Sequence, residues 1–188
     1  MKTFVEIGAC DFDTCLPLAK NGWMGVLVEP VKELADNLAQ QAKDFPFVRV
    51  ANVDVSEYNG EIDFRVSTGT EGDGWTRGIS SVASNNHKGD RMFDFDGGVN
   101  RHLLKETRKL NCYTLDALLD HYNIKQIDFL KMDTEGHETN IIEAYSWRVK
   151  PTFIKMEHKH IDDQNMKRIL EEQGYIVYVE TDDLYAIC

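Results

Sequence analysis

The sequence predicts an α/β fold with a mostly parallel sheet, helices on both faces and an antiparallel hairpin at its C-terminal end. Short apolar runs alternate along the chain with segments of helical periodicity, which is typical of a parallel sheet. The runs at 175–180 and 184–188 are separated by only three residues, so we expect them to pair antiparallel. The length of 188 residues fits one domain, which we expect to span 1–188.

Strands are predicted where short runs are apolar and rich in β-branched residues. GVLVE at 25–29 is almost continuously apolar, as buried parallel strands are, whereas EIDFRVS at 61–67 alternates as a half-exposed strand does. In chain order the predicted strands are 3–8, 25–29, 47–55, 61–67, 110–113, 127–132, 152–157, 175–180 and 184–188. We expect 110–113 to pair with 61–67.

Helices are predicted between these strands from spacing and capping signals. In chain order they are 14–21, 31–42, one that begins after Thr114, 135–145, and one between Asp162 and Gly174. Pro17 fits the first turn of a helix, where its missing N–H does no harm. Thr114 and Asp162 are expected N-caps, and Gly174 is an expected helix end.

Composition and charge exclude several classes of protein. Charged residues make up 28% of the chain and apolar residues 42%, which are ordinary globular values. The formal net charge of −11 argues against binding to nucleic acid or to an anionic membrane surface. No apolar run approaches the ~20 residues that span a bilayer, and the N-terminus lacks a signal-peptide pattern. The four cysteines lack C-x-x-C spacing and fit a reducing compartment, so we expect a cytoplasmic protein.

One stretch, 68–107, departs from the regular alternation. It holds 7 of the 13 glycines and has weak periodicity, which is rare in a compact domain unless the stretch is a lid or binding loop. Trp75, Phe93 and Phe95 lie within it and could cover a flat substrate. We therefore expect a glycine-rich lid at about 68–107.

A glycine and an acid end the first two predicted strands, where ligands of parallel sheets bind. Gly8 precedes Glu29 by 21 residues, close to the spacing of a glycine turn and an acid that binds ribose hydroxyls. The turn G-A-C-D-F-D lacks G-x-G-x-x-G, and Asp11 and Asp13 would repel a pyrophosphate. S-adenosylmethionine, a nucleoside with a sulfonium and an ammonium, suits this acidic turn. Further residues expected at the cofactor are Glu6, Ala9, Cys10, Asp11, Pro30, Val53 and Asp54.

Acids and an imidazole follow the later strands. Asp133 and Glu135 come after 127–132, and Glu157 and His158 after 152–157. Asp133 or the next residue could simply cap the following helix. Alternatively His158 acts as a general base, because its unperturbed pKa of about 6.5 lies near working pH. A third interpretation, which is not favoured, gives Asp133, Glu157 and His158 to a divalent metal ion.

The chain resembles a known enzyme family over nearly its whole length. The segments FVEIGACDFDT, GVLVEP, NVDVSEYNGEIDF, ISSV, YTLDALL, IDFLKMDTEGHE and PTFIKMEH occur in the order found in FkbM-type methyltransferases, and LKMDTEGHE is the most specific. The resemblance implies a Rossmann-like, seven-stranded methyltransferase fold and S-adenosylmethionine-dependent O-methylation of a hydroxyl on a saccharide or other polyhydroxylated small molecule. It implies catalytic roles for Asp133 and Glu135 and cofactor contacts from Ser81 and Asp133, and we expect Glu157 and His158, from their place after the next strand, to complete the catalytic group.

Two features depart from the family pattern. Phe12 stands where members commonly have a second glycine, and the first strand begins at Thr3. Cover for the substrate must then come from 68–107 or from a second subunit, so a homo-oligomer is one expectation. The alternatives to a methyltransferase are an NAD(P)-dependent oxidoreductase on a related fold and a non-catalytic nucleoside-binding module.

Overall fold

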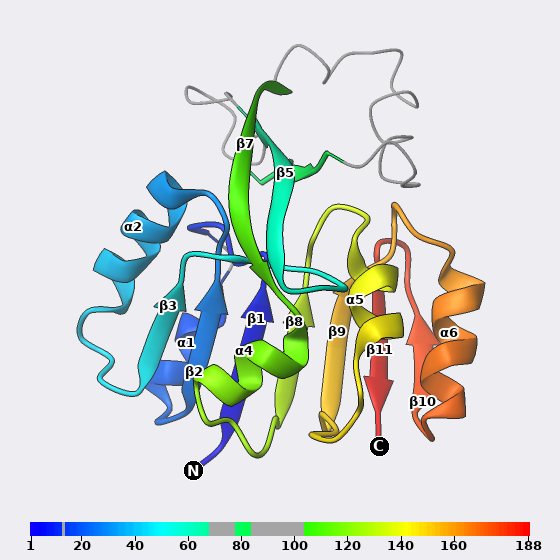
Figure 1. The fold of residues 1–188 in the computed structure, drawn as a ribbon. Helices are drawn as coiled ribbons and strands as arrows, with labels where there is room; N and C mark the ends of the chain where they lie inside the picture. Colours follow the sequence, from blue (N-terminus) through cyan, green and yellow to red (C-terminus); the bar gives the residue numbers. More distant parts are fainter. Residues whose placement is uncertain (13, 68–77, 84–103) are drawn as a thin grey trace.

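The computed structural model describes residues 1–12, 14–67, 78–83 and 104–188, and their main sheet has seven strands (Figure 1). The strands are β1 (Thr3–Ile7), β2 (Met24–Val28), β3 (Val48–Ala51), β8 (Phe129–Met132), β9 (Phe153–Glu157), β10 (Ile176–Val179) and β11 (Asp183–Ile187). Their order is β10-β11-β9-β8-β1-β2-β3. Strand β11 runs antiparallel to both neighbours, and the pairs on the β1 side of β9 are parallel. The predicted fold class and its C-terminal hairpin are confirmed.

Helices cover both faces of this sheet. They are α1 (Leu16–Lys20), α2 (Lys32–Ala42), α4 (Leu115–His121), α5 (Glu138–Ala144) and α6 (Asp163–Glu172). Because side chains alternate along a strand, Val5 packs in one core with residues of α4, α5 and α6, and Phe4 in another with residues of α1 and α2. Figure 1 shows α4, α5 and α6 in front of the sheet. None of the described helices is long and apolar enough to cross a membrane.

Most predicted helix ends are confirmed, with one exception. The hydroxyl of Thr114 accepts the Ala117 N–H, and the carboxylate of Asp162 accepts the Asn165 N–H. The helix predicted over 135–145 begins at Glu138 instead. Its carboxylate accepts N–H groups of the preceding turn, so a residue inside the helix does the capping that we expected of Asp133 or its neighbour.

A second, smaller sheet stands over the carboxyl ends of β1 and β2 (Figure 1). It consists of β4 (Asp54–Val55), β5 (Gly60–Ser67), β6 (Ser81–Val82) and β7 (Leu104–Tyr113), in the order β4-β7-β5-β6. The predicted pairing of 110–113 with 61–67 is confirmed.

Two expectations from the sequence concern residues of this second sheet. The strand predicted at 47–55 is wrong as one element, because it divides into β3 in the main sheet and β4 in the second. Of the predicted lid at 68–107, the described residues 78–83 and 104–107 contribute strand residues of the second sheet. The rest of that stretch, 68–77 and 84–103, lies outside the described residues.

Candidate active site

The turn after β1 brings the backbone of β1 against the end of β8. The N–H groups of Gly8 and Ala9 both donate to the carbonyl of Val28, at 3.1 and 2.9 Å. Gly8 has a φ of 76°, and a Cβ on it would lie 1.8 Å from the carbonyl oxygen of Asp133. A side chain is therefore excluded at Gly8 both by conformation and by space.

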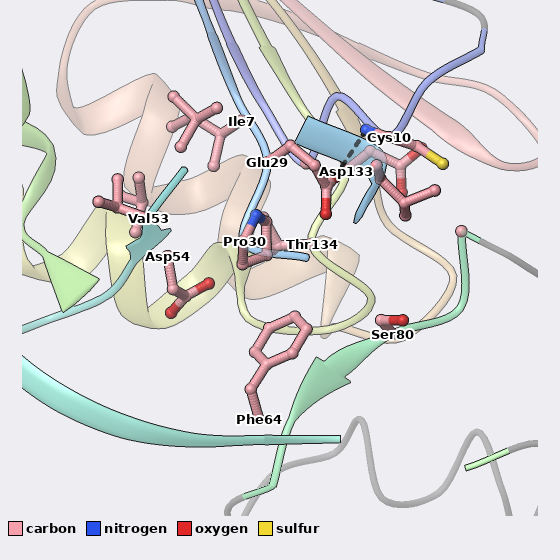
Figure 2. Close-up of a pocket in the computed structure, with 15 residues that line it drawn as sticks. Ile7, Cys10, Glu29, Pro30, Val53, Asp54, Phe64, Ser80, Asp133 and Thr134 are labelled. Atoms are coloured by element: carbon pink, nitrogen blue, oxygen red, sulfur yellow. Dashed lines mark hydrogen bonds between the residues drawn. The ribbon is translucent and has the colours of Figure 1, made fainter. Parts of the chain in front are cut away.

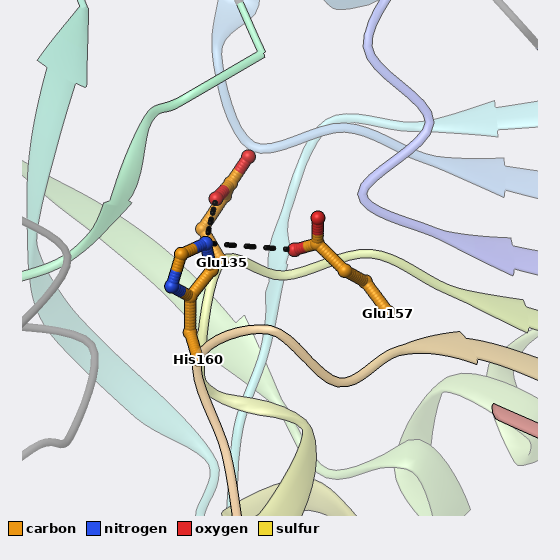
Figure 3. Close-up of side chains that lie close together, drawn as sticks. All are labelled: Glu135, Glu157 and His160. Carbon is orange, nitrogen blue, oxygen red and sulfur yellow. Dashed lines mark ion pairs between the residues drawn. The ribbon is translucent and has the colours of Figure 1, made fainter. Parts of the chain in front are cut away.

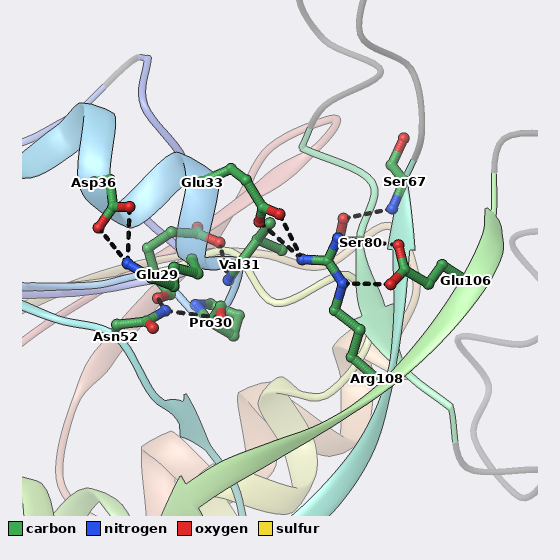
Figure 4. A network of polar contacts seen from close by, with 11 residues as sticks. Glu29, Pro30, Val31, Glu33, Asp36, Asn52, Ser67, Ser80, Glu106 and Arg108 are labelled. Carbon is green, nitrogen blue, oxygen red and sulfur yellow. Dashed lines mark hydrogen bonds and ion pairs between the residues drawn. The ribbon is translucent and has the colours of Figure 1, made fainter.

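The carboxylate of Glu29 is buried beside this turn. Oε2 accepts the N–H of Cys10 at 2.8 Å, and Oε1 accepts the N–H of Val31 at 2.7 Å. The side-chain amide of Asn52 donates to the main-chain carbonyls of Glu29 and Pro30, which fixes the same segment (Figure 4). Burial, reinforced by the nearby Asp11, raises the pKa of Glu29 to about 7 although both backbone hydrogen bonds act to lower it.

A first pocket opens above Glu29, at the point beside β1 where the strand order reverses (Figure 2). It encloses about 450 Å³ of space, part of it open to solvent. Its apolar wall consists of Ile7, Val28, Pro30, Leu34, Val53, Val55 and Phe64. Its other lining residues are Gly8, Cys10, Glu29, Asp54, Gly78, Ser80, Asp133 and Thr134.

Two polar atoms of this pocket are buried and lack hydrogen-bond partners among the described residues: Oδ2 of Asp54 and Oγ1 of Thr134. Burial is the main reason that the pKa of Asp54 is raised to about 8, and the charges of Glu29 and Glu57 add to it. Because unpaired buried polar atoms are uncommon in proteins, their presence in a pocket favours a polar ligand there.

The turn after β8 has an unusual backbone. Glu135 has a φ of 56° and Gly136 a φ of 99°. The carboxylate of Glu138 accepts the N–H of Thr134 at 2.6 Å and that of Gly136 at 3.1 Å, which holds this conformation. As a result, Asp133 faces the first pocket while Glu135 lines a second.

The second pocket adjoins the first and encloses about 810 Å³, again partly open to solvent. Its lining residues are Gly8, Ala9, Cys10, Phe12, Gly78, Ile79, Lys131, Asp133, Glu135, Glu157, Lys159 and His160. Gly8, Cys10, Gly78 and Asp133 line both pockets. A ligand in the first pocket can therefore present one end to the second.

Glu135, Glu157 and His160 form a tight cluster in the second pocket (Figure 3). Nε2 of His160 lies 3.5 Å from Oε2 of Glu135 and 3.9 Å from Oε2 of Glu157. Burial first, and then the neighbouring acids, raise the pKa of Glu135 well above its ordinary value and that of Glu157 to about 8. Burial and, second, the charge of Lys159 lower the pKa of His160, which favours the neutral imidazole.

The structure separates some predicted site residues from the pockets. Nε2 of His158 lies 2.7 Å from the carbonyl oxygen of Glu180, and His158 lines neither pocket, so it is not grouped with Asp133 and Glu157. Glu6 is fully buried below the turn, where its carboxylate accepts the Cys15 N–H at 2.7 Å and pairs with Lys131 at 3.0 Å.

Two further predicted residues, Asp11 and Ser81, lie beside the pockets without lining them. Asp11 accepts hydrogen bonds from the side chains of Asn37 and Gln41 on α2. Ser80, the neighbour of Ser81, lines the first pocket instead, and its hydroxyl accepts the Ser67 N–H (Figure 4).

Sequence reasoning missed several pocket residues. Phe64 is predictable only as an inward position of an alternating strand, and nothing local shows that β5 folds over the first pocket. Figure 4 shows an ion pair that links the second sheet to a helix of the main sheet: Arg108 of β7 pairs with Glu33 of α2 at 2.8 Å. Lys159 and His160 come shortly after the end of β9, at the same edge of the sheet, but the sequence does not show which side chains there turn inward.

The fold and the site define a class of protein. A mostly parallel sheet with a glycine turn and a buried acid at its switch point is a Rossmann-like architecture. The model of the Methyltransferase FkbM domain matches residues 6–177. The chain therefore belongs to the FkbM methyltransferase family, and the resemblance inferred from the sequence motifs is confirmed.

Solved structures share the fold at low sequence identity. The chain is similar to methyltransferase FkbM from Methylobacillus flagellatus KT, with a TM-score of 0.59 and 15% identity over 100% of this chain and 43% of that one. It is also similar to magnesium protoporphyrin IX methyltransferase from Synechocystis PCC 6803 with bound SAM (TM-score 0.50, 9% identity, covering 98% of this chain and 68% of that one). A third is Aeropyrum pernix fibrillarin with natively bound S-adenosyl-L-methionine (TM-score 0.50, 9% identity, 99% and 66%).

These likenesses establish the methyltransferase fold. The chain spans about 43% of the length of the Methylobacillus protein. No curated protein has a significantly similar sequence.

Proposed function

We propose that this chain transfers the methyl group of S-adenosylmethionine to a hydroxyl of a small acceptor. The observation that carries the proposal is the junction of the two pockets at Gly8, Cys10 and Asp133. The first pocket would take the nucleoside and the second the acceptor, so that the sulfonium lies at the junction. Two solved structures of the same fold carry S-adenosylmethionine, which supports this choice of cofactor.

Glu29 suits the ribose of such a cofactor. Each of its carboxylate oxygens accepts one backbone N–H, and a carboxylate oxygen can accept a second hydrogen bond. The two ribose hydroxyls can therefore donate one to each oxygen. The unpaired Oδ2 of Asp54 is an acceptor of the kind that the amino group of adenine requires. Ala9 and Cys10 would lie along the methionine part of the cofactor.

The acids at the junction favour a cationic reacting centre. Asp133 lines both pockets, with Glu135 and Glu157 beyond it in the second. In the transfer, a bond forms between the acceptor oxygen and the methyl carbon while the carbon–sulfur bond breaks and its electron pair stays on sulfur. The hydroxyl proton passes to the carboxylate of Asp133. Alignment of the reactants provides the larger share of catalysis, up to roughly 7–11 kcal/mol.

A saccharide or other polyhydroxylated molecule is the acceptor class that we propose. The second pocket offers carboxylates, the ammonium of Lys159 and the imidazole of His160, a mixture of donors and acceptors that suits several hydroxyls. The resemblance to FkbM-type O-methyltransferases supports the same class.

Calorimetry tests the cofactor first. S-adenosylhomocysteine should bind with one site per chain, and NADH, the ligand of the alternative oxidoreductase, should not. Transfer of labelled methyl groups to a panel of sugars and other polyols then tests the reaction. Asp133→Asn should keep the affinity for S-adenosylhomocysteine within a few-fold and lower turnover by about 10²-fold or more. Binding of the cofactor product without transfer to any acceptor would favour the non-catalytic nucleoside-binding module.

A further inference from the structure

We propose that Glu135, Glu157 and His160 form a binding site for one first-row divalent cation in the second pocket. The ligand set differs from the one that the sequence suggested, Asp133, Glu157 and His158, because the imidazole of His158 lies against the carbonyl of Glu180. His160, two residues later, takes its place beside the acids.

The spacing of the donor atoms fits such an ion. One nitrogen and two carboxylate oxygens all lie within 4.8 Å of one another, with two separations of 3.5 and 3.9 Å. A cation with ligand distances of about 2.0–2.2 Å places adjacent donors roughly 3.0–3.5 Å apart. Side-chain movements on the order of 1 Å would therefore close the site around an ion.

The three ligands come from two segments of the chain. Glu135 lies in the turn after β8, Glu157 is the last residue of β9, and His160 follows it in the next loop. Their side chains are 13%, 17% and 17% exposed. The site is thus enclosed by protein on one side and open to the second pocket on the other, which leaves coordination positions for an acceptor oxygen.

The charges around the cluster also call for a cation. Among the described residues, the carboxylate of Glu135 lies 3.5 Å from His160 and within 4.8 Å of the Glu157 carboxylate, and Lys159 is a cation that acts on both acids. Glu157 directs Oε1 toward Lys159 at 3.8 Å and Oε2 toward His160. Lys131 also lines the second pocket, and its ammonium pairs with Glu6 on the neighbouring strand β1. Half-buried carboxylates are unfavourable close together unless a cation compensates them.

The donor types narrow the choice of ion. Two carboxylates and one imidazole suit Mn²⁺, Fe²⁺ or Zn²⁺ better than soft ions that prefer sulfur. The role of the ion rests on the proposed function: it would bind an oxygen of the acceptor and lower the pKa of its hydroxyl, while Asp133 receives the proton.

Titration of the chelator-treated full chain with Mn²⁺ alone tests the site, with unbound Mn²⁺ measured by its paramagnetic resonance signal. We expect one ion per chain. Glu135→Gln, Glu157→Gln and His160→Gln should each weaken binding at least about tenfold, since removing one of three ligands exceeds the effect of losing an outer-shell partner. Glutamine keeps the size of each side chain, and circular dichroism checks that each variant folds.

Two histidine variants sharpen the test. His121→Gln, on the exposed end of α4, is the matched control and should bind Mn²⁺ as the unchanged protein does. His158→Gln distinguishes the two ligand sets and should also have little effect. Loss of binding in His158→Gln but not in His160→Gln would overturn the proposed set. So would absence of binding, or binding of several ions that none of the three cluster variants weakens.

S-adenosylhomocysteine binding, measured on the same preparations, separates this inference from the proposed function. Normal binding of S-adenosylhomocysteine without a manganese site overturns the cation site only. A manganese site without S-adenosylhomocysteine binding overturns the proposed cofactor instead.

Discussion

The buried carboxyl of Glu29 should make cofactor binding tighter at pH 8 than at pH 6. Only the ionised form accepts hydrogen bonds from both ribose hydroxyls while it also accepts the N–H groups of Cys10 and Val31. Burial raises the pKa of Glu29 to about 7 in the unliganded protein. Binding must therefore remove a proton from part of the population at pH 6, and the affinity falls accordingly.

The expected size follows from the ionised fraction. With a pKa of about 7, ionisation rises from about 9% at pH 6 to about 91% at pH 8. The dissociation constant should then decrease about tenfold, which corresponds to about 1.4 kcal/mol. Glutamine keeps one oxygen acceptor, so Glu29→Gln loses one charge-assisted hydrogen bond worth about 1.5–3 kcal/mol and should bind roughly 10- to 150-fold more weakly at pH 8.

Calorimetry with S-adenosylhomocysteine at pH 6, 7 and 8 measures both effects. Glu29→Gln should show a flatter profile, and any slope that it keeps reports titration of the ligand itself. Glu171→Gln is the matched control, because Glu171 is exposed on α6, pairs with Lys167 and lines neither pocket. The reasoning would be refuted if the affinity of the unchanged protein depended on pH no more steeply than that of Glu29→Gln. It would also be refuted if the two proteins bound S-adenosylhomocysteine equally tightly.

Three further predictions concern stability. Gly8→Ala should lower the free energy of unfolding, measured by urea titration, by more than about 2 kcal/mol, because the added Cβ would meet the carbonyl of Asp133. Gly22→Ala is the control: Gly22 has a similar φ of 79° but no atom within 4 Å of the added Cβ, so the free energy of unfolding should fall by only about 1 kcal/mol. The pKa of Asp54 is raised to about 8, so near neutral pH the folded protein keeps a proton on Asp54 that the unfolded chain has lost. The contribution of this group to the free energy of unfolding is greatest below its unfolded pKa and is lost as the pH rises through about 8. Thermal scans from pH 6 to 9 should therefore show a falling Tm, and Asp54→Asn should reduce that slope. In Glu138→Gln the side chain keeps one oxygen, so it can accept only one of the two backbone N–H groups of the preceding turn. The free energy of unfolding should therefore fall by about 1–3 kcal/mol. An unchanged free energy of unfolding would contradict this and would mean that water replaces the lost hydrogen bond.

The main sheet was predictable because its signals are local. Each of its strands has a continuous apolar or alternating run, and the caps Thr114 and Asp162 act within three residues. The second sheet was less predictable, because its strands pair over long separations in the sequence: β4 pairs with β7 through residues 54 and 112. The run 47–55 (FVRVANVDV) carries apolar residues from end to end with single polar residues between them, and nothing in its pattern shows where the chain passes from one sheet to the other.

In the candidate site, too, the residues at strand ends were predictable from the sequence and those in the following loops were not. Gly8 and Glu29 end strands, so their position at the carboxyl edge follows from the strand pattern, and both line the first pocket. His158 and His160 lie beyond the end of β9, where the alternation of side chains stops. Which imidazole faces the acids then depends on the loop conformation, and the sequence alone could not decide between them.

The central place of β1 has a consequence for the order of folding. β1 lies in the middle of the sheet although it precedes the other described strands in the sequence, and it pairs on one side with β2 and on the other with β8. The hydrogen bond from the Thr3 N–H to Asp128 joins residues 125 positions apart. During synthesis one edge of this strand must wait, unpaired, for most of the chain to emerge, and closing so large a loop slows folding. Until then, the exposed edge of β1 is where a nascent chain of this protein is most open to pairing with the wrong strand.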